Sequence, residues 1–176
     1  TWFVPMFPPA PGLFSITIVA PSASCSGRSM ARASWSVVPP AGYGTTMRIG
    51  FDGKVLCACA EVNNAGVAGR GGSTVQGFEQ MFGVNHLGTF LLTHELLPLL
   101  EKSAPSRVVV LSSALHYRGK MDWDDLQFEH RKYSGTAAYN QSKLANVLFT
   151  LELSRRLEGK GITVNAVHPG VVATEL

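Results

Sequence analysis

Two short apolar runs, SRVVVLSS at 106–113 and GITVNAVHP at 161–169, limit most strongly the folds open to this chain. Each has the length of a strand and is rich in β-branched residues, so we interpret both as strands covered on both faces, as in parallel sheets. Segments with helical spacing alternate with them over 63–170. The sequence therefore predicts an α/β fold, in which crossover helices join the strands of a parallel sheet.

Two helices are expected between these strands. The first enters at Ser73 or Thr74 and continues to about residue 103, because apolar residues recur at steps of three or four: Phe78, Phe82, Leu92, Leu96 and Leu99. Pro98 is expected to bend or end this helix. The second helix spans about 136–157 and carries an apolar stripe, which consists of Leu144, Val147, Leu148 and Leu151.

The first 60 residues differ in composition from the rest. Every acidic residue lies at Asp52 or later, and seven of the ten prolines fall within the first 40 residues. Between turn signals, FSITIVA and KVLCACA are the short strand-like runs. We therefore predict a Pro/Gly/Ser-rich leader of low order over 1–60 and a separate α/β domain over 61–176.

Composition argues against several classes of function. A formal net charge of +3 is too small to indicate a nucleic-acid partner. Cys25, Cys57 and Cys59 form neither an even disulfide set nor a paired metal motif, so we interpret them as free thiols in a reducing, intracellular compartment. The longest apolar run is about half of what spans a bilayer. No metal is expected, since metal-ligand spacing is lacking among His86, His94 and His168.

Tyr139 and Lys143 lie four residues apart in AAYNQSKLA, within the second expected helix. Residues at i and i+4 share one face of a helix. A free phenol is a poor proton shuttle near neutrality, and a nearby ammonium lowers its pKa. The pair therefore suits proton transfer to or from an alcohol or carbonyl oxygen. By itself the spacing is also compatible with an ordinary helix surface.

Further polar residues stand near the ends of the apolar runs. Ser112 and Ser113 end one run, where α/β folds bind ligands at the carboxyl edge of the sheet. VNNAG at 62–66 follows another run, and Asn85 lies inside the first helix. Each has a structural alternative, because the serines could simply end a strand. Likewise, the asparagines of VNNAG could be turn residues, and Asn85 could be a buried amide bonded to backbone.

The residues and their order resemble the short-chain dehydrogenase/reductase family. Its retinol dehydrogenase branch in particular is similar to the run KSAPSRVVVLSS…AAYNQSKLANVLFTLELSRRL…VNAVHPG. The resemblance covers about 62–176 and is specific, because five motifs fall in order with suitable spacing. It implies a partial doubly wound, Rossmann-type parallel sheet with crossover helices, incomplete at both ends.

By this resemblance, four residues would carry the chemistry. Tyr139 would be the general acid/base, and Ser113 would hold and polarise the same substrate oxygen. Lys143 would lower the pKa of the tyrosine and bind the hydroxyls of a nicotinamide ribose. Asn85 would hold a water that links the lysine to solvent.

The resemblance also implies NADP(H) as the cofactor, with NAD as the alternative. The adenosine side would be lined by Asn63, Asn64, Ala65 and Gly66, and the nicotinamide end would meet Pro169, Gly170, Val172 and Thr174. Arg28 in GRSMARAS is the candidate for contact with a 2′-phosphate.

The implied substrate is a small apolar alcohol or carbonyl compound of the retinol/retinal type. Between Ser113 and Tyr139 lies a loop whose aromatic residues would suit such a substrate near its entrance, or would form a satellite hydrophobic cluster: Tyr117, Trp123, Phe128 and Tyr133. A full-length parent could associate with a membrane, so the expected location is intracellular, either cytoplasmic or at the endoplasmic reticulum. The oligomeric state is not predicted.

One family motif has no match in these residues, namely the T-G-x-x-x-G-x-G turn that binds the pyrophosphate. The glycine runs AGYGTTM and AGRGGST lack its spacing. Without the family's first strands, the sheet is expected to expose an unpaired edge. Two hypotheses follow: an NADP(H)-dependent oxidoreductase, or a truncated or aberrantly spliced dehydrogenase fragment without activity.

Overall fold

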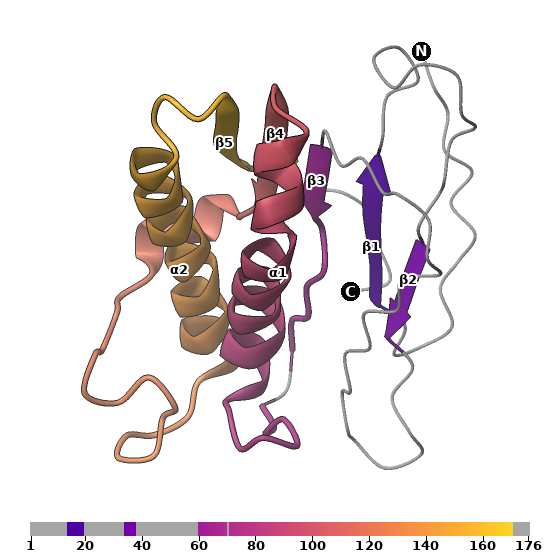
Figure 1. The fold of residues 1–176 in the computed structure, drawn as a ribbon. Coiled ribbons are helices and arrows are strands. Elements are labelled where there is room, and N and C mark those ends of the chain that lie inside the picture. Colours follow the sequence, from indigo (N-terminus) through magenta and orange to yellow (C-terminus); the bar gives the residue numbers. More distant parts are fainter. Residues whose placement is uncertain (1–13, 20–33, 38–59, 70, 171–176) are drawn as a thin grey trace.

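A computed structural model describes residues 14–19, 34–37, 60–69 and 71–170 of the chain (Figure 1). Five strands in these ranges form one sheet in the order β2-β1-β3-β4-β5. Two long helices, α1 and α2, lie side by side against it (Figure 1). The predicted boundary at residue 60 stays a prediction, because most of the leader, including nearly all of KVLCACA, lies outside the described residues.

The parallel part of the sheet consists of β3 (Ala60–Asn63), β4 (Ser106–Leu111) and β5 (Ile162–Val167). β3 pairs with β4, and β4 pairs with β5, both in parallel register. Along the chain, α1 lies between β3 and β4, and α2 lies between β4 and β5. The predicted α/β fold with crossover helices is therefore confirmed for this part of the chain.

Two strands of the leader extend the sheet by antiparallel pairing. β1 (Phe14–Val19), within the predicted strand FSITIVA, pairs antiparallel with β3, and β2 (Ser34–Val37) pairs antiparallel with β1. Among the described strands, β1 covers the outer side of β3, so the unpaired edge on this side of the sheet lies at β2. An open strand edge presents unpaired N–H and C=O groups that favour recruitment of a neighbouring strand.

The first helix begins later than predicted. A π-helical turn, η1 (Phe82–Leu87), leads into α1 (Gly88–Lys102). Residues 73–79 instead form a turn closed by a bridge between Ser73 and Glu79. The Glu79 carboxylate accepts hydrogen bonds from the backbone N–H groups of Met81 and Phe82, at 3.0 and 2.6 Å, and so satisfies orphan donors at the helix start.

Pro98 does not end the first helix, since α1 continues past it to Lys102. The second helix, α2 (Gly135–Arg156), confirms the prediction for 136–157 within a residue at each end. The Ser134 hydroxyl accepts a hydrogen bond from Ala137 N–H at the start of α2. A 3-10 helix, η2 (Ala114–Arg118), follows β4.

The main core fills the space between the two helices and the parallel strands. Its buried members are Leu92, Leu96, Leu100, Val108, Val110, Leu153, Leu157, Ile162 and Val164. Complete burial of a leucine such as Leu100 contributes roughly 1.5–3 kcal/mol of transfer free energy.

The predicted apolar stripe of α2 is not its buried face. Leu148 and Leu151 are 39% and 63% exposed, whereas Gln141, Ser142 and Asn146 are buried. β5 also differs from expectation, because Thr163 and other residues of its second face are exposed. Among the described residues, the helices cover one face of β4 and β5, so neither strand is buried on both sides. No helix in the described ranges is long and apolar enough to cross a membrane.

Candidate active site

Helix α2 brings Tyr139 and Lys143 together on one face. The ammonium nitrogen of Lys143 lies 5.7 Å from the centroid of the Tyr139 ring. Lys143 is 5% exposed, and Tyr139 is half-buried beside a small cluster of Met81, Phe128 and Ala138. The two side chains therefore lie on one face of the helix, as their spacing of four residues predicts.

Burial lowers the pKa of Lys143 to about 8. Its Nζ donates one hydrogen bond, at 3.3 Å, to the backbone carbonyl of Leu111 at the end of β4. An ammonium has three N–H donors. Lys143 is therefore a desolvated cation that is anchored at the end of a strand and retains donors for a further partner.

The two serines after β4 have different surroundings. Ser112 Oγ donates to the backbone carbonyl of Lys143 at 2.9 Å, and Ser112 N–H donates to Val167 O. Ser112 therefore ties β4 to both α2 and β5. Ser113 is half-buried at the start of η2, where its hydroxyl oxygen accepts from Leu115 N–H at 3.3 Å. Ser113 therefore caps η2, a role that the sequence did not predict, and its hydroxyl hydrogen is still available to a ligand.

Close contact between η2 and α2 depends on Gly119. A Cβ atom at this position would lie 2.6 Å from Asn140 O and 3.0 Å from His116 O. Since both are backbone atoms, neither can rotate away. Gly119 therefore allows the turn that carries Ser113 to approach the helix that carries Tyr139.

Replacing Gly119 by Ala is expected to destabilise the fold by about 1–3 kcal/mol, because the added methyl forces η2 away from α2. Urea denaturation measures this loss. Gly88→Ala is the matched control, because its Cβ would meet only Gly83 O at 3.7 Å, an ordinary contact. Equal stability of the two variants would contradict this account of Gly119.

Asn85 is fully buried within the π-helical turn. Its Oδ1 accepts from Val67 N–H at 2.7 Å, and its Nδ2 donates to Val67 O and Ser142 Oγ, both at 3.0 Å. The structural alternative of a buried amide bonded to backbone therefore describes its side chain. The water-holding role of Asn85 stays a prediction.

The VNNAG turn lies against the lysine. A Cβ at Gly66 would be 3.5 Å from Lys143 Nζ and 3.7 Å from Asn85 Oδ1. Ala65 and Gly66 are half-buried and Asn64 is exposed. The turn after β3 and the end of β4 thus meet the polar face of α2 at the carboxyl edge of the parallel strands, which is where α/β folds bind ligands.

Asn63 faces the interior at the end of β3. Its Nδ2 donates to Glu61 Oε1 at 2.9 Å and to Thr93 Oγ1 at 3.1 Å. These bonds hold β3 against α1. A direct contact between Asn63 and a cofactor stays a prediction.

Sequence reasoning missed the carboxyl group of Glu61. Burial raises its pKa from 4.5 to about 7. Glu61 is fully buried on β3, and its Oε1 accepts from Thr93 Oγ1 at 2.8 Å. Among the described residues, its Oε2 and Asn63 Oδ1 have no hydrogen-bond partner. An acidic residue inside a short apolar strand was the signal that could have identified it.

The remaining predicted cofactor residues are only partly described. Pro169 and Gly170 are exposed after β5, and Gly170 has a φ of 86°, which suits glycine. Val172, Thr174 and Arg28 lie outside the described residues.

The loop between Ser113 and Tyr139 is held by Arg131. Its guanidinium lies 3.8 Å from the centroid of the Phe128 ring, and it pairs with Asp122 and Asp125 at 3.2 and 3.4 Å. Phe128 belongs to the satellite cluster beside Tyr139, as one of the two interpretations expected. Tyr117 and Trp123 are 85% and 70% exposed, so their part in a substrate entrance stays a prediction.

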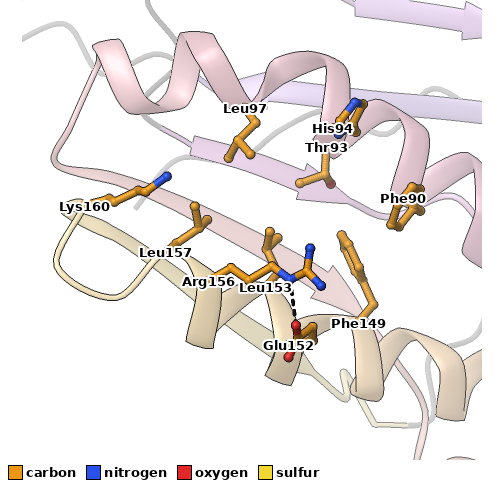
Figure 2. A pocket seen from close by; sticks show the side chains of 10 residues that line it. All are labelled: Phe90, Thr93, His94, Leu97, Phe149, Glu152, Leu153, Arg156, Leu157 and Lys160. Carbon is orange, nitrogen blue, oxygen red and sulfur yellow. Dashed lines mark hydrogen bonds and ion pairs between the residues drawn. The ribbon is translucent and has the colours of Figure 1, made fainter.

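A groove of about 420 Å³ lies elsewhere, between α1 and α2 (Figure 2). Its lining includes Phe90, Leu97, Phe149, Leu153 and Leu157, and Arg156 is paired there with Glu152 at 2.6 Å. None of the predicted site residues lines it. In the described part of the chain, no three His, Cys, Asp or Glu side chains gather as a metal site.

Comparison with known proteins gives a consistent family match. The family model described as short chain dehydrogenase matches residues 60–176. Human retinol dehydrogenase 13 is 61% identical over 116 residues, which are 65% of this chain and 35% of that protein. Mouse retinol dehydrogenase 14 is 55% identical over 116 residues, which are 65% of this chain and 34% of that protein. The chain thus spans about a third of the length of these curated relatives.

Two solved structures are also similar to this chain in fold. An uncharacterised protein from Mycobacterium paratuberculosis matches with a TM-score of 0.63 and 47% identity, over 71% of this chain and 46% of that one. Pseudomonas aeruginosa RhlG, solved as an active-site complex with NADP, matches with a TM-score of 0.51 and 28% identity, over 67% of this chain and 44% of that one.

Proposed function

This chain belongs to the short chain dehydrogenase family, and from that premise we propose that it carries the catalytic part of an NADP(H)-dependent oxidoreductase. The reaction is the interconversion of an apolar alcohol and the corresponding aldehyde or ketone. Tyr139, Lys143 and Ser113 are the residues that act on the substrate oxygen and its surroundings. The observation that carries the proposal is the buried ammonium of Lys143 beside the Tyr139 ring, at the carboxyl edge of the sheet.

The residues at this edge fit a nicotinamide ribose. Lys143 Nζ uses one donor for Leu111 O and keeps others for ribose hydroxyls. Gly66 beside it has no side chain to fill that space. When bound, a nicotinamide dinucleotide would supply the hydride chemistry, which no protein side chain can provide.

In the direction of carbonyl reduction, Tyr139 donates its phenolic proton to the substrate oxygen as negative charge develops there. The nearby Lys143 ammonium stabilises the phenolate that remains. Ser113 donates its hydroxyl hydrogen to the same oxygen and so fixes the carbonyl orientation. In the direction of alcohol oxidation, the phenolate accepts the hydroxyl proton.

The proposed substrate class follows from the names of the relatives. The curated relatives are retinol dehydrogenases, so a retinol- or retinal-like compound is the first choice. NADP is the proposed cofactor because RhlG was solved with it, and NAD is the alternative. We place the protein inside the cell, as its cysteine content suggests.

The second candidate is an inactive dehydrogenase fragment. It is favoured by the antiparallel pairing of β1 with β3, where the family resemblance implies a parallel strand. Such a chain would retain the catalytic face of α2 and lack a pyrophosphate cradle. Cofactor binding separates the two candidates.

Titration with NADPH, followed by its fluorescence, is expected to show saturable binding at micromolar concentration. Lys143→Met should weaken this binding by about tenfold or more, because it removes charge-assisted hydrogen bonds to the ribose. Lys120→Met is the control, since Lys120 is exposed. Absence of binding by the parent chain would favour the fragment.

A further inference from the structure

Asn146 is a buried hub that the sequence analysis did not identify. It lies three residues after Lys143 on α2 and is 1% exposed. Its Nδ2 donates to Asn85 O at 3.0 Å and to Leu111 O at 3.1 Å, and its Oδ1 lies 3.1 Å from His86 Nδ1. A single side chain therefore joins α2 to the π-helical turn and to the end of β4.

The surroundings determine how the Asn146 amide is oriented. Two backbone carbonyls lie on one side, and carbonyls can only accept, so the NH₂ group must face them. The Oδ1 atom then faces His86, whose Nδ1 must carry the hydrogen. Burial lowers the pKa of His86 and so favours its neutral form, which donates from Nδ1 in this arrangement.

Leu111 O is shared between Asn146 and Lys143. It accepts from Asn146 Nδ2 at 3.1 Å and from Lys143 Nζ at 3.3 Å, which occupies both lone pairs of the carbonyl. Asn85 O also accepts from two side chains, Asn146 Nδ2 at 3.0 Å and Thr89 Oγ1 at 3.1 Å. Asn146 thus competes with the lysine ammonium for Leu111 O, the one carbonyl that both side chains bond.

We propose that Asn146 is a positioning residue for Lys143. By occupying one lone pair of Leu111 O, it limits the lysine to one long hydrogen bond with the protein. The remaining N–H groups of Lys143 are then directed toward the cofactor ribose and Tyr139. This inference rests on the proposed function for its catalytic meaning, although its physical content can be measured without cofactor.

The test compares the reactivity of Lys143 in the free protein. Acylation by acetic anhydride, followed by mass spectrometry at a series of pH values, reports the neutral fraction of this one lysine. In Asn146→Leu, Leu111 O regains acceptor capacity and stabilises the ammonium more strongly. Acylation of Lys143 at pH 8 should therefore fall about fivefold relative to the parent chain.

Thr150→Val is the matched control on the same helix. It removes a buried hydroxyl that donates to Asn146 O at 2.8 Å, but it leaves Leu111 O and Asn85 O untouched. Tyr139, which lies beside Lys143, is unchanged in both variants. We expect the control to retain the parental acylation profile.

An Asn146→Leu profile that matches the parent would overturn the proposal. If the leucine variant does not fold, Asn146→Ser provides the same comparison, because its shorter hydroxyl cannot reach both carbonyls. In the parent itself, side-chain NH₂ protons of Asn146 that exchange as fast as those of an exposed asparagine would also overturn it. A parent without NADPH binding would count against the proposed function alone, because none of these measurements requires cofactor.

Discussion

Replacing Tyr139 by Phe is expected to lower kcat for carbonyl reduction by about 10²- to 10⁴-fold, the usual effect of losing a general acid. The ring remains, so packing against Met81, Phe128 and Ala138 is kept. The cofactor contacts assigned to Lys143 are also kept, so NADPH affinity should change little. The measurement is the rate of NADPH consumption with an apolar aldehyde such as retinal.

Two comparisons make this result specific. Tyr117→Phe removes a phenolic hydroxyl from a side chain that is 85% exposed, and it should leave kcat unchanged. Tyr139→Phe should be as resistant to urea as the parent chain, within about 0.5 kcal/mol. If the Tyr139 variant retained the parental kcat, the assignment of the proton to Tyr139 would be wrong.

A second large effect is expected at Glu61, where Gln should remove a strong dependence of stability on pH. Burial raises the pKa of the Glu61 carboxyl from 4.5 to about 7 in the folded protein. The folded state therefore holds this proton more tightly than the unfolded state. Below pH 4.5 the Glu61 carboxyl is protonated in both the folded and the unfolded state, so its burial carries no electrostatic cost. As the pH rises through about 7, the folded state must bury a charge and loses stability.

The expected loss is on the order of 3 kcal/mol at pH 8 relative to pH 4, from about 1.36 kcal/mol for each pKa unit between the two states. Glu61→Gln keeps the side-chain shape and has no charge to bury, so its free energy of unfolding should vary much less over this range. Urea denaturation at several pH values measures the difference.

Glu95→Gln is the control, because Glu95 is an exposed carboxylate on the same α1 that contacts Glu61 through Thr93. It should retain the pH dependence of the parent chain. The same pH profile in the Glu61→Gln variant and the parent would show that Glu61 is not the group responsible.

The elements that sequence predicted well are those whose local pattern and tertiary environment agree. The run at 106–111 is a strand, and the segment at 135–156 is a helix that places Tyr139 and Lys143 on one face. A β-branched run and a fixed spacing of four residues carry this information without reference to the rest of the chain.

The start of the first helix could not be predicted, because it depends on a tertiary-stabilised cap. Apolar spacing alone extends the helix back to Ser73, but Gly77 has a φ of 86° and Glu79 bonds the first helical N–H groups. Tyr133, which is far away in sequence, fixes the Glu79 carboxylate with a hydrogen bond of 3.0 Å. A one-dimensional pattern contains no record of that partner.

The buried face of α2 was assigned wrongly for a related reason. Hydrophobic spacing favoured Leu148 and Leu151, yet Ser142 and Asn146 face inward because each finds buried partners on the π-helical turn. Polar groups are buried when they are satisfied, and satisfaction depends on the fold. The repeat of Tyr139, Lys143 and Asn146 at helical steps was the available signal for a polar inner stripe.

The π-helical turn at Phe82–Leu87 amounts to a one-residue insertion in an otherwise regular helix. Deleting one residue there would restore ordinary helical winding and rotate everything on its N-terminal side by about 100°. The amide of Asn85 would then turn away from Val67 and from Ser142, both of which it now bonds. In this segment, chain length therefore constrains the site as strictly as residue identity does, and a single-codon deletion should be more damaging than most substitutions.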